Sequence, residues 1–167
     1  MNKSYAAPLF ERQIEGELLP CCKATGIATL TYGALCRGLP SGKLKEDAAF
    51  AGDDLRRIDP KFRSPRFARY LAAVRRLDEF AQRHYGKRVI HLTVRWLLDQ
   101  SATAALWGAR HPRSIGADRR GLRVVARDAP AKADIDRILR TEISDPVGPK
   151  FMAPPLRSLA EASQAAE

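Results

Sequence analysis

Residues 28–43, ATLTYGALCRGLPSGK, predict a buried strand that leads into a glycine-rich loop. Residues 27–32 are nearly all apolar or Thr and rich in β-branched side chains, as expected for a parallel strand that is covered on both faces. We therefore expect this strand to be central in its sheet. The loop combines residues that let the backbone turn sharply with residues that carry positive charge for an anion such as a phosphate: Gly33, Gly38, Gly42, Arg37 and Lys43. The alternative is an ordinary turn with solvated basic residues.

The loop does not match either of two common phosphate-binding motifs. A P-loop requires a glycine five residues before its Gly-Lys pair and a Ser or Thr after the Lys. Arg37 and Leu44 occupy these two positions. The dinucleotide fingerprint GxGxxG does not occur either. Phosphate binding by this loop would therefore need a different arrangement of backbone and charge.

A second strand and loop repeat this pattern later in the chain. Residues 103–107 predict a strand, and residues 108–112, GARHP, contain Gly108 and Arg110. Because the carboxyl ends of parallel strands lie at one edge of a sheet, we expect both loops to form one ligand-binding edge. Residues 1–8 are a further candidate for a strand. The predicted fold class is therefore α/β.

Four segments predict helices. Residues 15–24 form a short helix that stops at Gly26, and residues 131–142 form an amphipathic one. The strongest begins at Ser64 and Pro65 and stops at Gly86, and its apolar face should pack on the sheet: Phe67, Leu71, Val74, Phe80 and Ala81. Residues 89–100 should direct four side chains inward: Ile90, Val94, Leu97 and Leu98. Residues 45–65 form a long connection without sustained periodicity, which is typical of functional or disordered loops.

Length and composition indicate a globular protein of about one domain. The 167 residues are 45% hydrophobic and 29% charged, which argues against a disordered or fibrous chain. No apolar run reaches the ~18 residues of a membrane span, and the N-terminus lacks the apolar core of a secretory signal, so we expect a cytoplasmic protein. The cysteines and histidines form neither a disulfide framework nor a metal-binding pattern: Cys21, Cys22, Cys36, His84, His91 and His111.

The formal net charge of +10 raises the alternative of a nucleic-acid-binding module. Part of the positive charge lies on the helix after Pro65, where Asp78 and Glu79 are interleaved, as on a solvated face. A denser group of arginines lies in residues 110–127. This alternative function would use the Arg-rich segment to bind nucleic acid.

The segment ALCRGLPSGK, after a strand that ends in Tyr32, resembles the loop after the seventh barrel strand of NADPH-dependent aldo-keto reductases. Further stretches resemble this family in the expected order: LFERQIE, FAGDDLRRIDPKF, KRVIHLTVRWLLDQ, ALWGARHP and DPVGPKFMAPP. The resemblance covers residues 9–155. It implies a partial (β/α)8 TIM barrel of about the last three βα units, with residues 1–157 as the C-terminal portion of the barrel and residues 158–167 as a flexible tail.

The resemblance also implies a binding site for NADP(H). Tyr32 stands where an aromatic ring stacks on the nicotinamide, and Arg110, after Gly108, stands where a guanidinium holds the adenosine 2′-phosphate. The following residues belong to the stretch that wraps the pyrophosphate: Gly33, Leu35, Arg37, Gly38 and Lys43. Ser114 and Asp118 complete the expected set, at positions where the family usually has Gln and Asn.

The family's catalytic Asp, Tyr, Lys and His lie on the first four strands, and no residue of this chain matches them. The resemblance therefore implies the cofactor-binding half of an oxidoreductase that acts on aldehydes or ketones and is inactive alone. The expected partners are a nicotinamide cofactor and either a complementary N-terminal half or a second copy of the chain at exposed strand edges. No membrane partner is expected. The sequence leaves open both the carbonyl substrate and whether the chain is an enzyme by itself.

Overall fold

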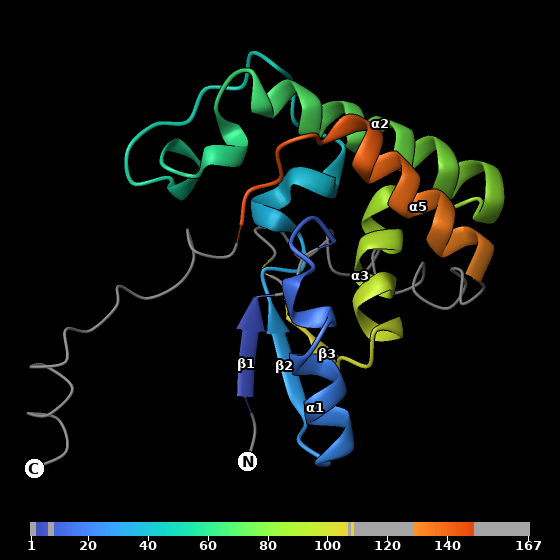
Figure 1. The fold of residues 1–167 in the computed structure, drawn as a ribbon. Coiled ribbons are helices and arrows are strands. Elements are labelled where there is room, and N and C mark those ends of the chain that lie inside the picture. Colours follow the sequence, from blue (N-terminus) through green and yellow to red (C-terminus); the bar gives the residue numbers. More distant parts are fainter. Residues whose placement is uncertain (1–2, 7–8, 107, 109–128, 149–167) are drawn as a thin grey trace, which may run out of the picture.

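The computed structural model describes residues 3–6, 9–106, 108 and 129–148. Its sheet has three parallel strands in the order β1-β2-β3. β1 (Lys3–Ala6) pairs with β2 (Thr29–Tyr32) along its whole length, and β2 also pairs with β3 (Ala104–Ala105). The strands point the same way and end at one edge of the sheet, as the sequence predicts (Figure 1).

The central position of β2 confirms one prediction, and its buried residues show how the sheet is held. The hydroxyl of Thr31 donates a hydrogen bond to the carbonyl of Ala104 at 3.0 Å. Thr29 and Thr103 exchange two hydrogen bonds between backbone N–H and hydroxyl groups, at 3.0 and 3.1 Å. Because the hydroxyl groups of the buried Thr29 and Thr31 are satisfied, the strand can place Thr in the interior at little cost.

The outer strands differ in detail from the prediction. The candidate strand in residues 1–8 exists as β1. The predicted strand in residues 103–107 is shorter, although the Leu106 N–H still donates to the Thr31 carbonyl at 2.7 Å, one residue beyond β3. The carboxyl end of the sheet therefore extends to Leu106.

The predicted helices form, and glycines end two of them. α1 (Leu18–Ala24) stops before Gly26, and α2 (Arg66–Tyr85) stops at Gly86, which adopts the left-handed conformation with φ 60°. The other two are α3 (Val89–Asp99) and α5 (Ala129–Glu142). Short 3-10 helices lie in the connections: η1 (Gln13–Glu15), η2 (Cys36–Ser41), η3 (Leu55–Arg57) and η4 (Pro60–Phe62). None of the helices in the described ranges is long and apolar enough to span a membrane.

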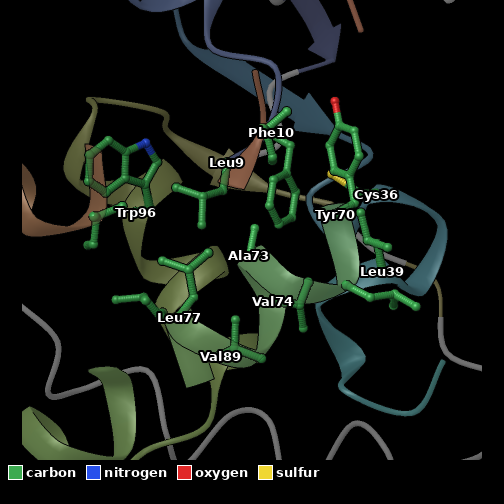
Figure 2. Packing of buried hydrophobic residues seen from close by; sticks show 14 of the residues in the cluster. Leu9, Phe10, Cys36, Leu39, Tyr70, Ala73, Val74, Leu77, Val89 and Trp96 are labelled. Carbon is green, nitrogen blue, oxygen red and sulfur yellow. The ribbon is translucent and has the colours of Figure 1, made fainter. Parts of the chain in front are cut away.

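The apolar face of α2 is buried as predicted, but the expectation that it packs on the sheet is wrong. α2 packs mainly against α3, α5 and the 3-10 helices η2 and η4. Figure 2 shows Leu9 and Phe10, from the segment after β1, lying between Tyr70 on α2 and Trp96 on α3. The rings of Phe10 and Tyr70 meet edge to face at 5.5 Å. The main core therefore lies between the helices and the loops at the carboxyl edge.

The inward face of α3 also differs from the prediction. Ile90 and Leu98 are only half-buried, whereas Leu92 and Trp96 are buried. The Trp96 ring packs under the guanidinium of Arg12 at 4.4 Å, and its indole N–H donates to Glu15 at 2.8 Å. Since Trp96 has both an apolar environment and a partner for its N–H, it is part of the core.

Polar contacts and one buried hydrogen bond join α2 to the last residue of α5 and to the segment that follows it. The arginines of α2 contact residues at and after the end of α5 in three pairs: Arg66 with Asp145, Arg69 with Ser144, and Arg76 with Glu142. The buried Tyr70 hydroxyl accepts a hydrogen bond from the Val147 N–H at 3.0 Å. These contacts fix the segment that follows α5 against the helical layer.

Candidate functional site

The carboxyl edge of the sheet exposes two apolar side chains. Ala6 lies opposite Tyr32 in the strand register, and Leu106 follows β3 beside the end of β2. Tyr32 is 37% exposed and Leu106 is 45% exposed, although both follow buried or half-buried strand residues. The edge therefore presents an apolar surface at the place where parallel α/β folds bind ligands.

The loop after β2 has an unusual backbone. Gly33, Gly38 and Gly42 adopt positive φ values of 71°, 88° and 69°, as the glycine pattern suggests. Cys36 and Arg37 also adopt positive φ values, 42° and 58°, although both carry side chains. Residues with side chains rarely adopt this conformation, and it persists only where surrounding contacts hold it.

Arg88, at the start of α3, contacts the end of this loop. Its Nη2 donates to the carbonyl of Ser41 at 2.9 Å, and a side chain at Gly42 would lie 2.9 Å from the same atom. The Lys43 N–H donates to the Ser41 hydroxyl at 3.3 Å, and Lys43 itself is exposed. Lys43 is therefore an exposed cation next to a turn that Arg88 holds in place.

Arg37 lies next to a chain of buried charges. Its Nε is 3.3 Å from Oδ2 of Asp59, which is completely buried. The same carboxylate oxygen lies 3.1 Å from Nζ of Lys61, and that Nζ lies 2.5 Å from Oε1 of Glu11. We call Glu11, Arg37, Asp59 and Lys61 the ion quartet. It contains two carboxylates and two cations from three separate segments.

Electrostatics within the ion quartet favour charged Lys61. Burial lowers the pKa of Lys61, but the hydrogen bond and charge of Glu11 and the charge of Asp59 outweigh burial and raise the pKa above its ordinary value. Oδ1 of Asp59 also accepts the backbone N–H of Lys61 at 3.0 Å, which caps η4. Lys61 is therefore charged at neutral pH, and the cap that Asp59 provides anchors η4.

Cys36 is unsuited to nucleophilic chemistry. Burial raises the pKa of its thiol strongly, and the negative charge of Glu11 adds to the effect. The thiol therefore stays neutral at physiological pH, and only a thiolate would be an effective nucleophile. Its role is in the core, where it packs near Tyr70 and Leu39 (Figure 2).

The long connection contains η3 and η4, and its arginines contact other residues of the same connection. Arg56 pairs with Asp54 and lies over the ring of Phe50 at 4.3 Å. Arg57 donates to the carbonyl of Gly52. Two apolar side chains of this connection are nevertheless well exposed, Leu55 at 57% and Ile58 at 55%.

The structure brings together only part of the predicted site. Tyr32 lies at the end of β2, and the loop residues Gly33, Leu35, Arg37, Gly38 and Lys43 follow it in η2 and its flanking turns. Gly108 is exposed just beyond β3. Arg110, Ser114 and Asp118, together with the whole Arg-rich segment 110–127, lie outside the described residues. No group of metal-ligating side chains occurs in the part of the chain that the structure describes.

Sequence reasoning missed Glu11, Asp59, Lys61 and Arg88. Asp59 before Pro60 is a usable signal, since an Asp followed by Pro is typical of the start of a helical turn. The burial of Glu11 and Lys61 has no local signal, because charged side chains are normally exposed. Only their pairing in space makes burial acceptable.

Comparisons with known proteins agree with this geometry. Residues 3–120 match the model of the aldo/keto reductase family. Aldo-keto reductase YhdN of Bacillus subtilis is 54% identical over 152 residues, which cover 89% of this chain and 45% of that protein. Aldo-keto reductase str7 of Strobilurus tenacellus is 31% identical over 83 residues, which cover 50% of this chain and 24% of that protein. The chain thus spans less than half the length of these relatives.

Solved structures show the same fold. The glycerol dehydrogenase AKR11B4 of Gluconobacter oxydans superposes with a TM-score of 0.79 at 40% identity, covering 91% of this chain and 46% of that one. The holo form of the aldo-keto reductase AKR11C1 of Bacillus halodurans superposes with a TM-score of 0.61 at 14% identity, covering 83% of this chain and 42% of that one, and supports the α/β fold alone. Family model, sequence relatives and structure therefore agree that this chain belongs to the aldo/keto reductase family of oxidoreductases.

Proposed function

We propose that this chain forms the cofactor-binding part of an NADP(H)-dependent aldo-keto reductase. The observation that carries the proposal is the exposed Tyr32 at the end of the central strand, directly before a loop with a left-handed backbone. An aromatic ring beside a glycine-rich turn suits a nicotinamide joined to a diphosphate. The three cysteines are all unpaired, in keeping with a protein that works in the cytoplasm.

The proposed roles are given from the nicotinamide end of the cofactor to its adenine end, along the carboxyl edge of the sheet. Tyr32 stacks on the nicotinamide ring. Residues of the β2 loop wrap the diphosphate, with Lys43 as its exposed cation: Gly33, Leu35, Arg37, Gly38 and Lys43. After β3, Gly108 and Arg110 hold the 2′-phosphate, which a planar guanidinium binds well and which distinguishes NADPH from NADH. Ser114 and Asp118 contact the adenine end.

We further propose that residues 1–157 are about the last three βα units of a (β/α)8 barrel, with residues 158–167 as a tail. Within the described residues, β1 and β3 each pair with β2 alone, so their outer edges carry backbone groups that another strand can bind. A complementary N-terminal half, or a second copy of the chain, would cover these edges. A compact monomer in size-exclusion chromatography, stable at high concentration, would contradict this part of the proposal.

By itself, the 167-residue chain should not reduce aldehydes or ketones. Hydride transfer builds negative charge on the carbonyl oxygen, and no residue here matches the family's proton-donating Tyr or its Lys, His and Asp. Loss of a positioned general acid costs about 10² to 10⁴ in rate. We expect no NADPH oxidation with the chain alone and turnover only after an N-terminal half is added. Turnover by the chain alone that survives Tyr32→Phe would show a proton donor elsewhere.

Cofactor binding is tested by fluorescence titration of the purified chain with NADPH and with NADH. Arg110→Ala should weaken NADPH binding by about 1.5 to 3 kcal/mol and change NADH binding little, because a charge-assisted bond to the 2′-phosphate is lost. Equal losses for both cofactors would refute this role for Arg110. A titration with duplex DNA serves as the control for the +10 charge. Tight, steeply salt-dependent duplex binding without NADPH binding would favour the nucleic-acid alternative instead.

A further inference from the structure

The loop that follows β2 needs something to hold its backbone. Cys36, Arg37 and Gly38 adopt positive φ in succession, at 42°, 58° and 88°. Gly38 accepts this conformation freely, but Cys36 and Arg37 are disfavoured in it because their Cβ atoms crowd the backbone. Two hydrogen bonds close the turn locally: Cys36 N–H to the Gly33 carbonyl at 2.8 Å and Gly38 N–H to the Leu35 carbonyl at 2.6 Å. These backbone bonds would form equally well with glycine at positions 36 and 37, so they do not explain why the two positions carry side chains.

The side chains of Cys36 and Arg37 are what tie the loop to the rest of the molecule. Cys36 is buried among Leu39, Tyr70 and the other core residues (Figure 2). Arg37 directs its Nε at Asp59, 3.3 Å away, and its side chain is only 20% exposed. A left-handed backbone at both positions thus places one side chain in the core and the next on a buried carboxylate.

The carboxylate of Asp59 is itself held on both sides. Its Oδ1 accepts the Lys61 N–H at 3.0 Å, and its Oδ2 lies 3.1 Å from Lys61 Nζ. Lys61 reaches across to Glu11, 50 residues away in sequence, at 2.5 Å. Asp59 and Lys61 belong to the long connection, while Glu11 follows β1. Through the ion quartet, the position of the β2 loop therefore depends on two other segments at the same edge.

We propose that Arg37 is a positioning residue of the cofactor site: it holds the β2 loop in its left-handed shape by binding Asp59 of the ion quartet, and it does not act as a cation on the cofactor's diphosphate. This inference rests on the proposed cofactor site. Lys43, which is exposed and has no carboxylate contact in the described residues, is the loop cation that meets the phosphate charge. Glu11, Asp59 and Lys61 act on the site only through Arg37 and η4.

Three variants of the 167-residue chain separate positioning from direct binding, with NADPH as the probe. Arg37→Ala removes the contact with Asp59 and keeps a side chain in the left-handed region, so NADPH affinity should fall about tenfold. Arg37→Gly removes the same contact and the same charge but accepts positive φ freely, so it should recover most of that loss. Lys43→Ala is the control variant that removes an exposed cation. Of the three variants, only Lys43→Ala should reduce the salt dependence of NADPH binding.

A second readout does not need the cofactor. Hydrogen exchange of the free chain should show faster exchange of loop amides in residues 36–42 in Arg37→Ala than in Arg37→Gly. If Arg37→Gly loses as much NADPH affinity as Arg37→Ala and also flattens the salt dependence, Arg37 binds the diphosphate directly and the inference is overturned. If the wild-type chain binds no NADPH, the proposed function fails, and the exchange rates alone decide whether Arg37 holds the loop. Equal exchange in the two variants would then overturn the positioning role as well.

Discussion

Lys61→Met is the most informative single substitution, because Lys61 lies between two buried carboxylates. Lys61 is 2% exposed, Glu11 is 5% exposed and Asp59 is fully buried. Asp59 would keep Arg37 at 3.3 Å, but Glu11 would lose a partner at 2.5 Å and remain in the interior. Removing one partner of a buried ion pair costs about 3 to 5 kcal/mol. For a domain whose whole free energy of unfolding is about 5 to 15 kcal/mol, this loss is large.

The double variant Glu11→Leu with Lys61→Met should recover most of that loss. Both charges of the pair are then gone, and apolar side chains of similar volume fill the space, an exchange that is often neutral or stabilising. Asp59 and Arg37 still face each other. The free energy of unfolding of the double variant should therefore lie above that of Lys61→Met by about 2 to 4 kcal/mol, which is most of the loss of about 3 to 5 kcal/mol in the single variant.

Urea unfolding followed by circular dichroism measures these free energies for the wild type, both single variants and the double variant. Lys43→Met is the matched control, since Lys43 is exposed and its loss should change stability by no more than about 0.5 kcal/mol. If the effects of Glu11→Leu and Lys61→Met simply add, the two side chains are not coupled. The account of the ion quartet would then be wrong.

Three further predictions concern the core and the sheet. Because folding raises the pKa of the Cys36 thiol, the thiol ionises above about pH 8.5 in unfolded chains but stays neutral in the folded protein. The free energy of unfolding should therefore fall with rising pH by about 1.4 kcal/mol per pH unit. Urea titrations between about pH 9 and 10 should show this slope in the wild type and not in Cys36→Ala. Tyr70→Phe leaves the buried Val147 N–H without its acceptor and should lower the free energy of unfolding by about 1 to 3 kcal/mol. Hydrogen exchange in the segment after α5 should become faster, and unchanged exchange there would argue that the Tyr70–Val147 bond does not hold this segment. Thr31→Val leaves the Ala104 carbonyl without its hydroxyl donor and should lower the melting temperature, whereas Thr25→Val, which loses a hydrogen bond of an exposed residue, should lower it less.

The sign of the pH prediction follows from the direction of the shift. A group whose pKa is raised by folding stabilises the protein fully below its ordinary pKa and loses that contribution as pH rises toward the folded value. Lys61 and Tyr70 also have raised pKa values, and burial is the main influence on Tyr70, so they add to the alkaline loss only near and above pH 10. The window from pH 9 to 10 therefore reports mainly on Cys36.

Local patterns in the sequence were sufficient for the strands, the α-helices and their order, but not for the 3-10 helices of the connections. The β-branched run before Tyr32 predicts β2 and its central place, and Pro65 with Gly86 predicts the ends of α2 to within a residue or two. These features depend on backbone preferences of neighbouring residues, which act wherever the chain goes. The glycines of the β2 loop likewise predict its turns, because only they adopt positive φ freely.

Tertiary structure decided which partner each side chain meets. The pattern of α2 shows that one face is buried, but whether helices or a sheet cover it depends on the packing of distant segments, and here α3 and α5 do. Arg37 appears in the sequence as a loop cation, yet it faces Asp59 because Asp59 is held by Lys61, which in turn binds Glu11. Burial of these charges is tolerated because each carboxylate has a cationic partner from another segment, and no stretch of neighbouring residues can encode that pairing by itself.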